Sequence, residues 1–182
     1  MIKLWKITKL ISKWAAIFAF ALMLIMALAW LIGLRFNKTN SIPYGIYKTV
    51  NKKVVRNSFV RFCPPDTEAF RIGRERNYIP VGFCPHGYME LMKEVIGIPG
   101  DTYQFTEQGL ILNGILIPNT KPIKEDISHR PMPLNKAKGF LENDEYILMG
   151  LEIPNSYDAR YYGVIRKENI TGSLEPLLIM KD

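Results

Sequence analysis

Two residues that lie far apart in the chain have the chemistry of a nucleophile and its base. Ser41 lies in the segment Thr39-Asn40-Ser41-Ile42-Pro43, and Lys93 opens the run Lys-Glu-Val-Ile-Gly-Ile-Pro-Gly-Asp. A lysine on the buried face of a strand has a lowered pKa, and its neutral amine can then act as a general base. Each residue alone also has a plain structural explanation, because serine and proline are common in turns and an edge-strand lysine discourages aggregation.

A third polar segment, residues 155–163, carries a serine, an aspartate and an arginine in close succession. Asp158 and Arg160 can form an ion pair, and the Ser156 hydroxyl can hydrogen-bond a nearby amine. By itself the segment is typical of a polar loop. The segment can take part in catalysis only if the fold brings it close to Ser41 and Lys93.

The N-terminal part of the chain predicts a membrane anchor. Residues 14–34 are 21 residues without a charge, and a helix of about that length crosses a hydrocarbon core of about 30 Å. Basic residues bracket the run, and Trp14 and Trp30 lie toward its ends, where indole rings favour the interface. Four lysines precede the run within 13 residues, which favours a cytoplasmic segment 1–13 and an extracytoplasmic domain 35–182.

Two alternatives to an anchor stay open. A basic start followed by Ala27-Leu28-Ala29, which has the small-x-small form of a cleavage site, also fits a cleaved signal peptide. A buried helix of a soluble protein is the other alternative. With an uncleaved anchor, Ser41 lies only seven positions after Leu34, and an extended chain of that length spans at most about 25 Å. Ser41 would then be held close to the lipid headgroups.

The net charge of +7 is concentrated in the N-terminal segment. Residues 1–35 carry five basic side chains and no acidic one, so 19 of the 24 basic residues stand against all 17 acidic residues in the remainder. The basic balance therefore belongs mainly to the expected anchor and is no argument for nucleic-acid binding. We expect no nucleic-acid partner.

The remaining residues predict one compact, mainly β domain. Short apolar runs bounded by turn residues predict strands, and Asn113-Gly114 fits the type I′ turn of a hairpin. A helix is expected over Asp66–Arg76, capped by Thr67 or Asp66, and residues 121–139 are expected to be a long surface excursion. The expected strands are 58–62, 91–98, 109–113, 114–117, 145–149 and 177–180.

Together, the three polar motifs resemble the type I signal peptidase superfamily. They occur in the order Ser-x-Pro, Lys-x-Val-Ile-Gly-x-Pro-Gly-Asp and Asn-Ser-x-Asp-x-Arg-Tyr-x-Gly. Within that superfamily, Ser41-Ile-Pro-Tyr-Gly-Ile-Tyr47 and the two Phe-Cys-Pro segments are most similar to the TraF-type peptidases of conjugative transfer systems. The resemblance extends from the apolar run to Gly163 and implies a signal-peptidase-like β domain behind one transmembrane helix.

The resemblance implies a role for each motif residue. Ser41 matches the nucleophile and Lys93 the general base, while the Thr39 hydroxyl and the Ser41 N–H match the oxyanion hole. This chemistry uses no cofactor and no metal, and His86 and His129 are expected to be bystanders. The supporting residues are Ser156, which orients the lysine amine, and the bracing pair Asp158 and Arg160.

The chain departs from the common signal peptidase pattern at several positions. Only Ile42 separates the serine from its proline, where many signal peptidases have two residues, and Gly150-Leu151-Glu152 replaces the expected Gly-Asp after the Tyr146 strand. These two differences favour the conjugation branch. Glu94 also stands where a basic residue is usual, and Ala159 replaces a common serine.

Cys63 and Cys84 are the two cysteines, and both lie in the expected extracytoplasmic domain. An oxidising compartment and an even count favour one disulfide between them. Two reduced, buried thiols are the alternative. Zinc binding by both cysteines and His86 lacks a familiar ligand spacing.

The expected function is that of a membrane-bound serine endopeptidase that matures a pilin precursor of a conjugation or type IV secretion system, by cleavage alone or with cyclisation. It is expected in the bacterial inner membrane as a single-pass protein with its catalytic domain on the periplasmic side. Its expected partners are the membrane, a pilin or preprotein substrate and other conjugation or secretion components. The alternatives are a general type I signal peptidase that removes leader peptides and a non-catalytic membrane-tethered scaffold of pilus assembly.

Overall fold

The computed structural model describes residues 2–39 and 41–180. The side chains of residues 2–4 and 6 lie outside this description, so two of the four N-terminal lysines do too. The chain divides into two units, residues 1–35 and 36–182.

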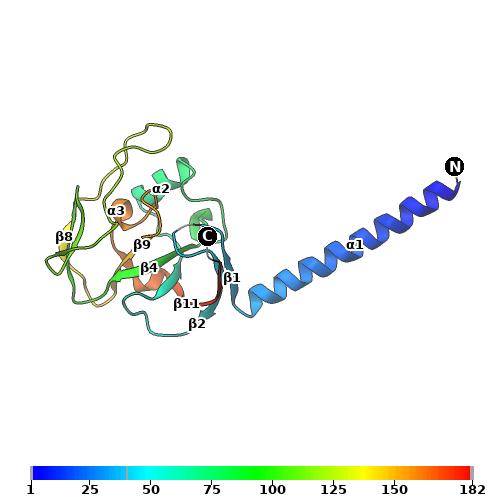
Figure 1. Cartoon of the computed structure of the whole chain (residues 1–182), viewed down its shortest axis with the longest axis horizontal. Coiled ribbons are helices and arrows are strands. Elements are labelled where there is room, and N and C mark those ends of the chain that lie inside the picture. The colour runs from blue at the N-terminus through cyan, green and yellow to red at the C-terminus, as the bar shows by residue number, and fades with distance from the viewer. Residues whose placement is uncertain (1, 40, 181–182) are drawn as a thin grey trace. The chain divides into compact units, whose positions relative to one another are not determined.

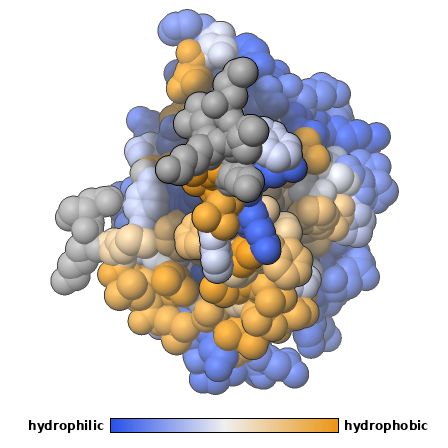
Figure 2. Space-filling view, turned by 90° about the vertical axis from the view of Figure 1, so that its right-hand side faces the viewer, coloured by the Kyte–Doolittle hydropathy of each residue, from blue (hydrophilic) through white to orange (hydrophobic). Residues whose placement is uncertain are grey.

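The first unit is one long helix, α1 (Ile2–Leu31), which begins within the basic segment and ends three residues before the predicted end of the anchor (Figure 1). Its stretch Ile7–Leu31 is 25 residues long and apolar enough to cross a membrane by length and composition. Large apolar side chains are exposed along it, including Phe18 and Leu31. Figure 2 shows hydrophobic residues, in orange, gathered on one part of the surface, with hydrophilic residues, in blue, around them. An exposed apolar helix of this kind is suited to lipid.

The second unit is mainly β, as predicted, and is built on two sheets. The larger sheet has the strand order β1-β2-β11-β3-β4-β9-β10, and the smaller has the order β7-β6-β5-β8. In Figure 1, β11 near the red end of the colour scale lies beside cyan β2. The larger sheet comprises β1 (Leu34–Asn37), β2 (Gly45–Val50), β3 (Phe59–Phe62), β4 (Leu91–Gly97), β9 (Glu145–Met149), β10 (Ile165–Arg166) and β11 (Ile170–Ile179).

The smaller sheet contains the predicted hairpin. Asn113 and Gly114 have φ angles of 51° and 81°, and both central residues of a type I′ turn need such positive values. The strands of this sheet are β5 (Thr102–Thr106), β6 (Gly109–Leu112), β7 (Ile115–Leu116) and β8 (Lys138–Phe140). The prediction of a hairpin at this position is confirmed.

Short helices complete the domain. Helix α2 (Glu68–Glu75) begins two residues later than predicted, and the Thr67 side chain makes no capping hydrogen bond. Residues 159–162, expected within a polar loop, form α3 (Ala159–Tyr162), whose N-cap Asp158 accepts from the Arg160 N–H. The 3-10 turns are Pro85–Gly87 and Lys167–Asn169.

The predicted strand 177–180 is wrong in its extent, because it is only the end of the ten-residue strand β11. Gly172 and Pro176 interrupt the apolar alternation, and the pairing register shifts at both places. Such bulges let a strand continue through residues that normally end one. Strand β11 pairs antiparallel with β2 on one side and β3 on the other, which makes it central to the sheet.

The core lies in three clusters that fix strand β4. Val95 belongs to a cluster with Val60 and Phe62 of β3, whereas Ile96 belongs to a second cluster with residues of β5, β6 and β9. The third cluster joins Ile42, which directly follows Ser41, to Tyr47 and Leu174. Strand β4 is therefore held in the middle of the domain, and its side chains have little freedom to move.

Candidate active site

Lys93 lies on β4 with strands on both sides, so its backbone position is fixed by the sheet. It pairs with Val60 of β3, and its side chain is only 3% exposed. Its Nζ lies 2.7 Å from Oγ of Ser41 and 2.7 Å from Oγ of Ser156. The fold thus brings together three side chains from segments that are 52 and 63 residues apart in the chain.

The surroundings of Lys93 lower its pKa to about 8. Burial is the main cause, because it removes water from the charged amine. The carboxylate of Asp158 opposes this shift, and the guanidinium of Arg160 adds to it. An amine with this pKa is neutral in part of the molecules near neutral pH, whereas an ordinary lysine is almost entirely charged.

The ion pair between Asp158 and Arg160 holds the loop that carries Ser156. Both side chains are buried, with exposures of 0% and 1%, and they meet through two hydrogen bonds of 2.8 and 2.7 Å. Asp158 also accepts from the Gly150 N–H, while Arg160 donates to the backbone oxygens of Pro154 and Ser156. The pair ties the segment 150–156 together from both ends, which fits the bracing role implied by the resemblance.

Gly150 is a contributor to this geometry that the sequence did not indicate. A Cβ atom at this position would lie 2.4 Å from Oγ of Ser156 and 2.9 Å from Cα of Ser41. A side chain at this position would therefore push the segment that carries Ser41 and the Ser156 loop apart. Glycine is needed here because backbone and side chain approach closely.

Thr39 lies two residues before Ser41, but its hydroxyl donates to another residue. Its Oγ1 and its backbone N–H both donate to Oδ1 of Asn37, at 2.9 and 3.1 Å. The resemblance implied that this hydroxyl stabilises an oxyanion beside Ser41. In this structure the Thr39 hydroxyl donates its single hydrogen to Asn37. Asn40, which lies between Thr39 and Ser41 in the chain, is outside the described residues.

A cleft of about 420 Å³ opens beside Ser41. One wall comes from the end of α2 and the residues after it, and the other from the excursion that follows β7. Asp126 orders this excursion, because its carboxylate accepts from the Tyr78 hydroxyl and from the Arg130 side chain. The lining residues include Thr39, Ser41, Ser156, Arg76, Tyr78, Ile123, Ile127, Arg130 and Met132.

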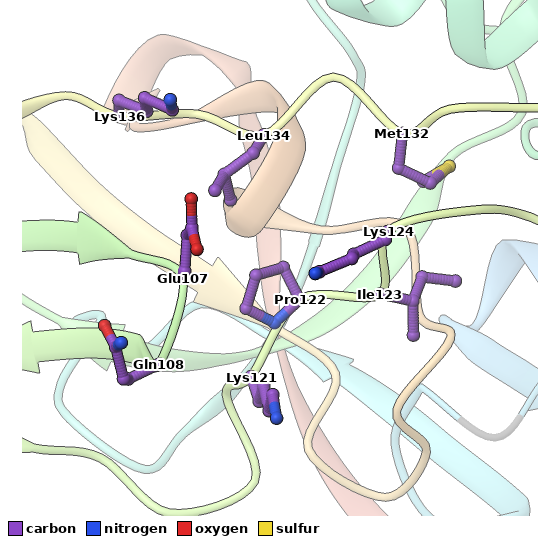
Figure 3. Close-up of a pocket in the computed structure, with 9 residues that line it drawn as sticks. All are labelled: Glu107, Gln108, Lys121, Pro122, Ile123, Lys124, Met132, Leu134 and Lys136. Atoms are coloured by element: carbon purple, nitrogen blue, oxygen red, sulfur yellow. The ribbon is translucent and has the colours of Figure 1, made fainter.

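A second groove, of about 560 Å³, is lined by residues of this excursion together with Glu107 and Gln108 of the β5–β6 turn (Figure 3). It shares Ile123 and Met132 with the cleft beside Ser41. Figure 3 shows the Lys124 side chain extending toward Pro122, with Glu107 on the opposite side. The segment predicted as a simple surface excursion therefore forms a wall common to two concave surfaces.

Comparison with known proteins identifies the family. A family model described as signal peptidase, peptidase S26, matches residues 7–178. The chain belongs to the S26 signal peptidase family. Two of its similar relatives are a plasmid transfer protein TraF of Escherichia coli, 37% identical over 92% of this chain and 96% of that protein, and a probable conjugal transfer protein TraF of Sinorhizobium fredii, 35% identical over 82% and 79%.

Two proteins named as signal peptidase I are also similar to this chain. A signal peptidase I of Leptolyngbya laminosa is 30% identical over 44% of this chain and 37% of its own length. A crystal structure of a signal peptidase I from Enterococcus faecalis matches with a TM-score of 0.40 and 19% identity, over 69% of this chain and the whole of that one. The predicted resemblance to the type I signal peptidase superfamily and to its TraF-type members is confirmed by the family model and the TraF relatives.

Cys63 and Cys84 form a disulfide, with their Cα atoms 5.5 Å apart. Because both sulfurs are bonded to each other, neither supplies a thiolate for zinc. The bond joins the end of β3 to the turn before β4, and Cys84 packs in the same core cluster as Val60. It therefore supports the strand pair that carries Lys93.

Proposed function

We propose that this S26 family member is a serine endopeptidase in which Ser41 is the nucleophile and Lys93 the general base. The observation that carries the proposal is the 2.7 Å contact between Oγ of Ser41 and a buried lysine whose pKa is lowered to about 8. A serine hydroxyl becomes an effective nucleophile when an adjacent neutral base can take its proton. Ser156 contacts the same amine at 2.7 Å and orients it.

The proposed reaction has two stages. Neutral Lys93 accepts the Ser41 hydroxyl proton as Oγ attacks the peptide carbonyl, and the Ser41 N–H and the Thr39 hydroxyl are the proposed oxyanion donors. The protonated amine then gives its proton to the leaving amine, and an acyl-enzyme ester on Ser41 remains. Water resolves the ester to a linear product, and the amino group at the substrate's own N-terminus would resolve it to a cyclic one.

We further propose that the substrate is a pilin precursor of a conjugation or type IV secretion system. Relatives that match most of the chain are named as plasmid or conjugal transfer proteins TraF, which supports a role in conjugation. The helix Ile7–Leu31 is compatible with a single membrane anchor. A single-pass protein of the bacterial inner membrane, with residues 35–182 on the periplasmic side, would meet such a precursor as it leaves the bilayer.

The test compares the mass of the mature pilin in conjugating cells that carry the wild type, Ser41→Ala or Lys93→Ala. Either replacement should leave the precursor uncleaved and abolish transfer. Ser128→Ala and Lys138→Ala are matched controls, since both are exposed and lie outside the proposed dyad. Normal maturation with Ser41→Ala or Lys93→Ala would refute the peptidase proposal and favour a scaffold. A mature product lighter by one water than the linear form would indicate cyclisation.

A second candidate is a general type I signal peptidase. The match to the family model of signal peptidases and to the signal peptidase I of Leptolyngbya laminosa favours it. Such an enzyme should restore growth to cells depleted of their own leader peptidase, and a pilin-specific one should not. The same cells with Ser41→Ala provide the control for catalysis.

A further inference from the structure

We propose that Asn37 is the positioning residue of the nucleophile segment. This inference rests on the proposed function, because it assigns to Asn37 the placement of Ser41 beside Lys93. Asn37 is the last residue of β1 and is 3% exposed, although asparagine is usually a surface residue. Its side chain makes five hydrogen-bond contacts within the next six residues of the chain.

The oxygen and the nitrogen of the Asn37 amide bind different groups of the loop. Oδ1 accepts the backbone N–H and the hydroxyl of Thr39 at 3.1 and 2.9 Å. Nδ2 donates to the backbone oxygens of Thr39, Ile42 and Pro43 at 2.7, 2.8 and 3.0 Å. The oxygen uses both of its lone pairs, and the two hydrogens of the nitrogen serve three acceptors. The amide orientation is thereby fixed, because a flipped side chain would set its oxygen against three carbonyl oxygens.

These contacts lie on both sides of the nucleophile. Thr39 precedes Ser41 by two residues, and Ile42 and Pro43 follow it directly. The Pro43 oxygen also accepts from the Tyr47 hydroxyl at 2.6 Å, and Ile42 is buried in the cluster with Tyr47. Asn37 thus closes the segment into a loop whose ends cannot separate, and Ser41 is presented from that loop to the Lys93 amine.

The same amide also controls the direction of the Thr39 hydroxyl. A hydroxyl has one hydrogen to donate, and that of Thr39 goes to Asn37. To donate to an oxyanion instead, the hydroxyl must rotate and give up this bond, while the Thr39 N–H still holds Oδ1. Asn37 therefore keeps the Thr39 backbone in place during such a rotation.

The replacement Asn37→Asp tests this role with almost no change in size. Aspartate keeps an oxygen for Thr39 but puts a second oxygen where Nδ2 donates to three carbonyls. We expect the loop to be displaced, kcat to fall by at least tenfold and KM to change less than threefold, with the full-length protein in lipid vesicles and the pilin precursor of the transfer assay as substrate. The predicted loss in kcat follows because a small misplacement of a reacting group is costly.

Asn113→Asp is the matched control. Asn113 also uses both ends of its amide, accepting from the Thr102 N–H and donating to Asp101, but it lies in the β6–β7 turn. Its replacement should lower the thermal unfolding midpoint and leave kcat per folded molecule unchanged. A positioning role for Asn37 predicts the opposite, a loss of kcat in molecules that are still folded at the assay temperature.

A double-mutant cycle adds a readout that a purely structural role would not move. If Asn37 acts in part through Thr39, Asn37→Asp combined with Thr39→Val should cost less in kcat than the product of the two single effects. Should Asn37→Asp fail to fold, Asn37→Ser replaces it in both measurements. A kcat equal to that of the wild type, or a loss that only follows the fraction unfolded, overturns the inference. Full activity of Ser41→Ala would instead overturn the proposed function itself.

Discussion

Oγ of Ser41 and Oγ of Ser156 lie 3.4 Å apart, and the amine of Lys93 contacts both. A lysine amine that shares its hydrogen bonds between two hydroxyls has a defined direction. One hydroxyl belongs to the proposed nucleophile, and the other belongs to a loop held by the buried pair Asp158 and Arg160. Replacing either hydroxyl should therefore change the direction of the Lys93 amine.

The activity of the protein should rise with pH through a value near 8. The folded-state pKa of Lys93 is about 8 instead of the usual 10.5, and only the deprotonated amine can accept the Ser41 proton. Peptide cleavage measured as kcat/KM should therefore be lost as the pH falls below this value. A rise that begins only near the ordinary lysine pKa would contradict the role of Lys93.

The same shift has a signature in stability. Between about 8 and the ordinary value of 10.5, the unfolded state binds more protons at this site than the folded state. The free energy of unfolding should therefore rise with pH across this window. Lys93→Met, which keeps the length of the side chain without its charge, should remove this part of the pH dependence in denaturant titrations.

Ser156→Ala should lower kcat without unfolding the protein. It removes one of the two hydroxyls that direct the Lys93 amine. The amine becomes charged when it takes the Ser41 proton, and a hydrogen bond to a charged group is worth about 1.5–3 kcal/mol. The expected loss is therefore about tenfold to a hundredfold. Ser128→Ala in the wall of the same cleft is the control, and equal kinetics of the two variants would argue against an orienting role.

Arg160→Met should destabilise the domain by about 3–5 kcal/mol, because it leaves a buried aspartate without its partner. Both members of the pair are at most 1% exposed. Arg166→Met breaks a surface pair with Asp144, 3.9 Å apart, and should cost at most about 1 kcal/mol. Chemical denaturation of both variants provides the comparison, and similar midpoints would mean that the buried pair is not needed for stability.

Gly150→Ala should reduce activity about a hundredfold, since the added methyl group would displace Ser156 or Ser41 from Lys93. Gly139→Ala is a suitable control, because the nearest atom to its added Cβ would be at 3.5 Å, an ordinary contact. Kinetics and thermal unfolding are measured on both. Wild-type kinetics of Gly150→Ala would show that the loop adjusts without affecting the site.

Replacing Cys63 and Cys84 together by alanine should lower the free energy of unfolding by about 3 kcal/mol, because the bond closes a loop of roughly 20 residues. The hydrogen bonds that direct the Lys93 amine go to Ser41 and Ser156 and do not involve the disulfide, so kcat of the folded variant should stay within a factor of two. Unfolding of the wild type in reducing buffer checks the first expectation. A large loss of kcat under conditions in which the double variant is still folded would show that the disulfide helps to shape the site.

The sequence indicated the residues with chemistry better than the strands that carry them. Lys93 stood out because a charge interrupts an apolar run, and the structure places it on the buried face expected from alternation. Strand β2 and the start of β11 were missed, since their residues alternate poorly and Gly172 and Pro176 resemble turn residues. Their pairing depends on contacts between distant segments, which a local pattern does not contain.

Two residues beside the site, Asn37 and Gly150, were also missed because their contacts involve other segments of the chain. Asn37 looked like an ordinary polar residue beside the apolar run, and its importance depends on a loop that folds back on it. Gly150 followed a predicted strand, where a glycine is expected in any turn. Only the closeness of Ser41 and Ser156 shows why a larger residue would not fit.

The site is assembled from three segments that become available at different times during synthesis. Ser41 precedes the sheet, Lys93 lies in its middle, and Ser156 and its ion pair come near the C-terminal end of the chain. A growing chain that has been made only as far as β9 has the serine and the lysine, but lacks the loop that directs the amine. Strand β11, which lies between β2 and β3, is made later still. The sheet that holds Lys93 beside Ser41 therefore cannot close until nearly the whole chain has been made, so the proposed protease would be inert as a nascent chain.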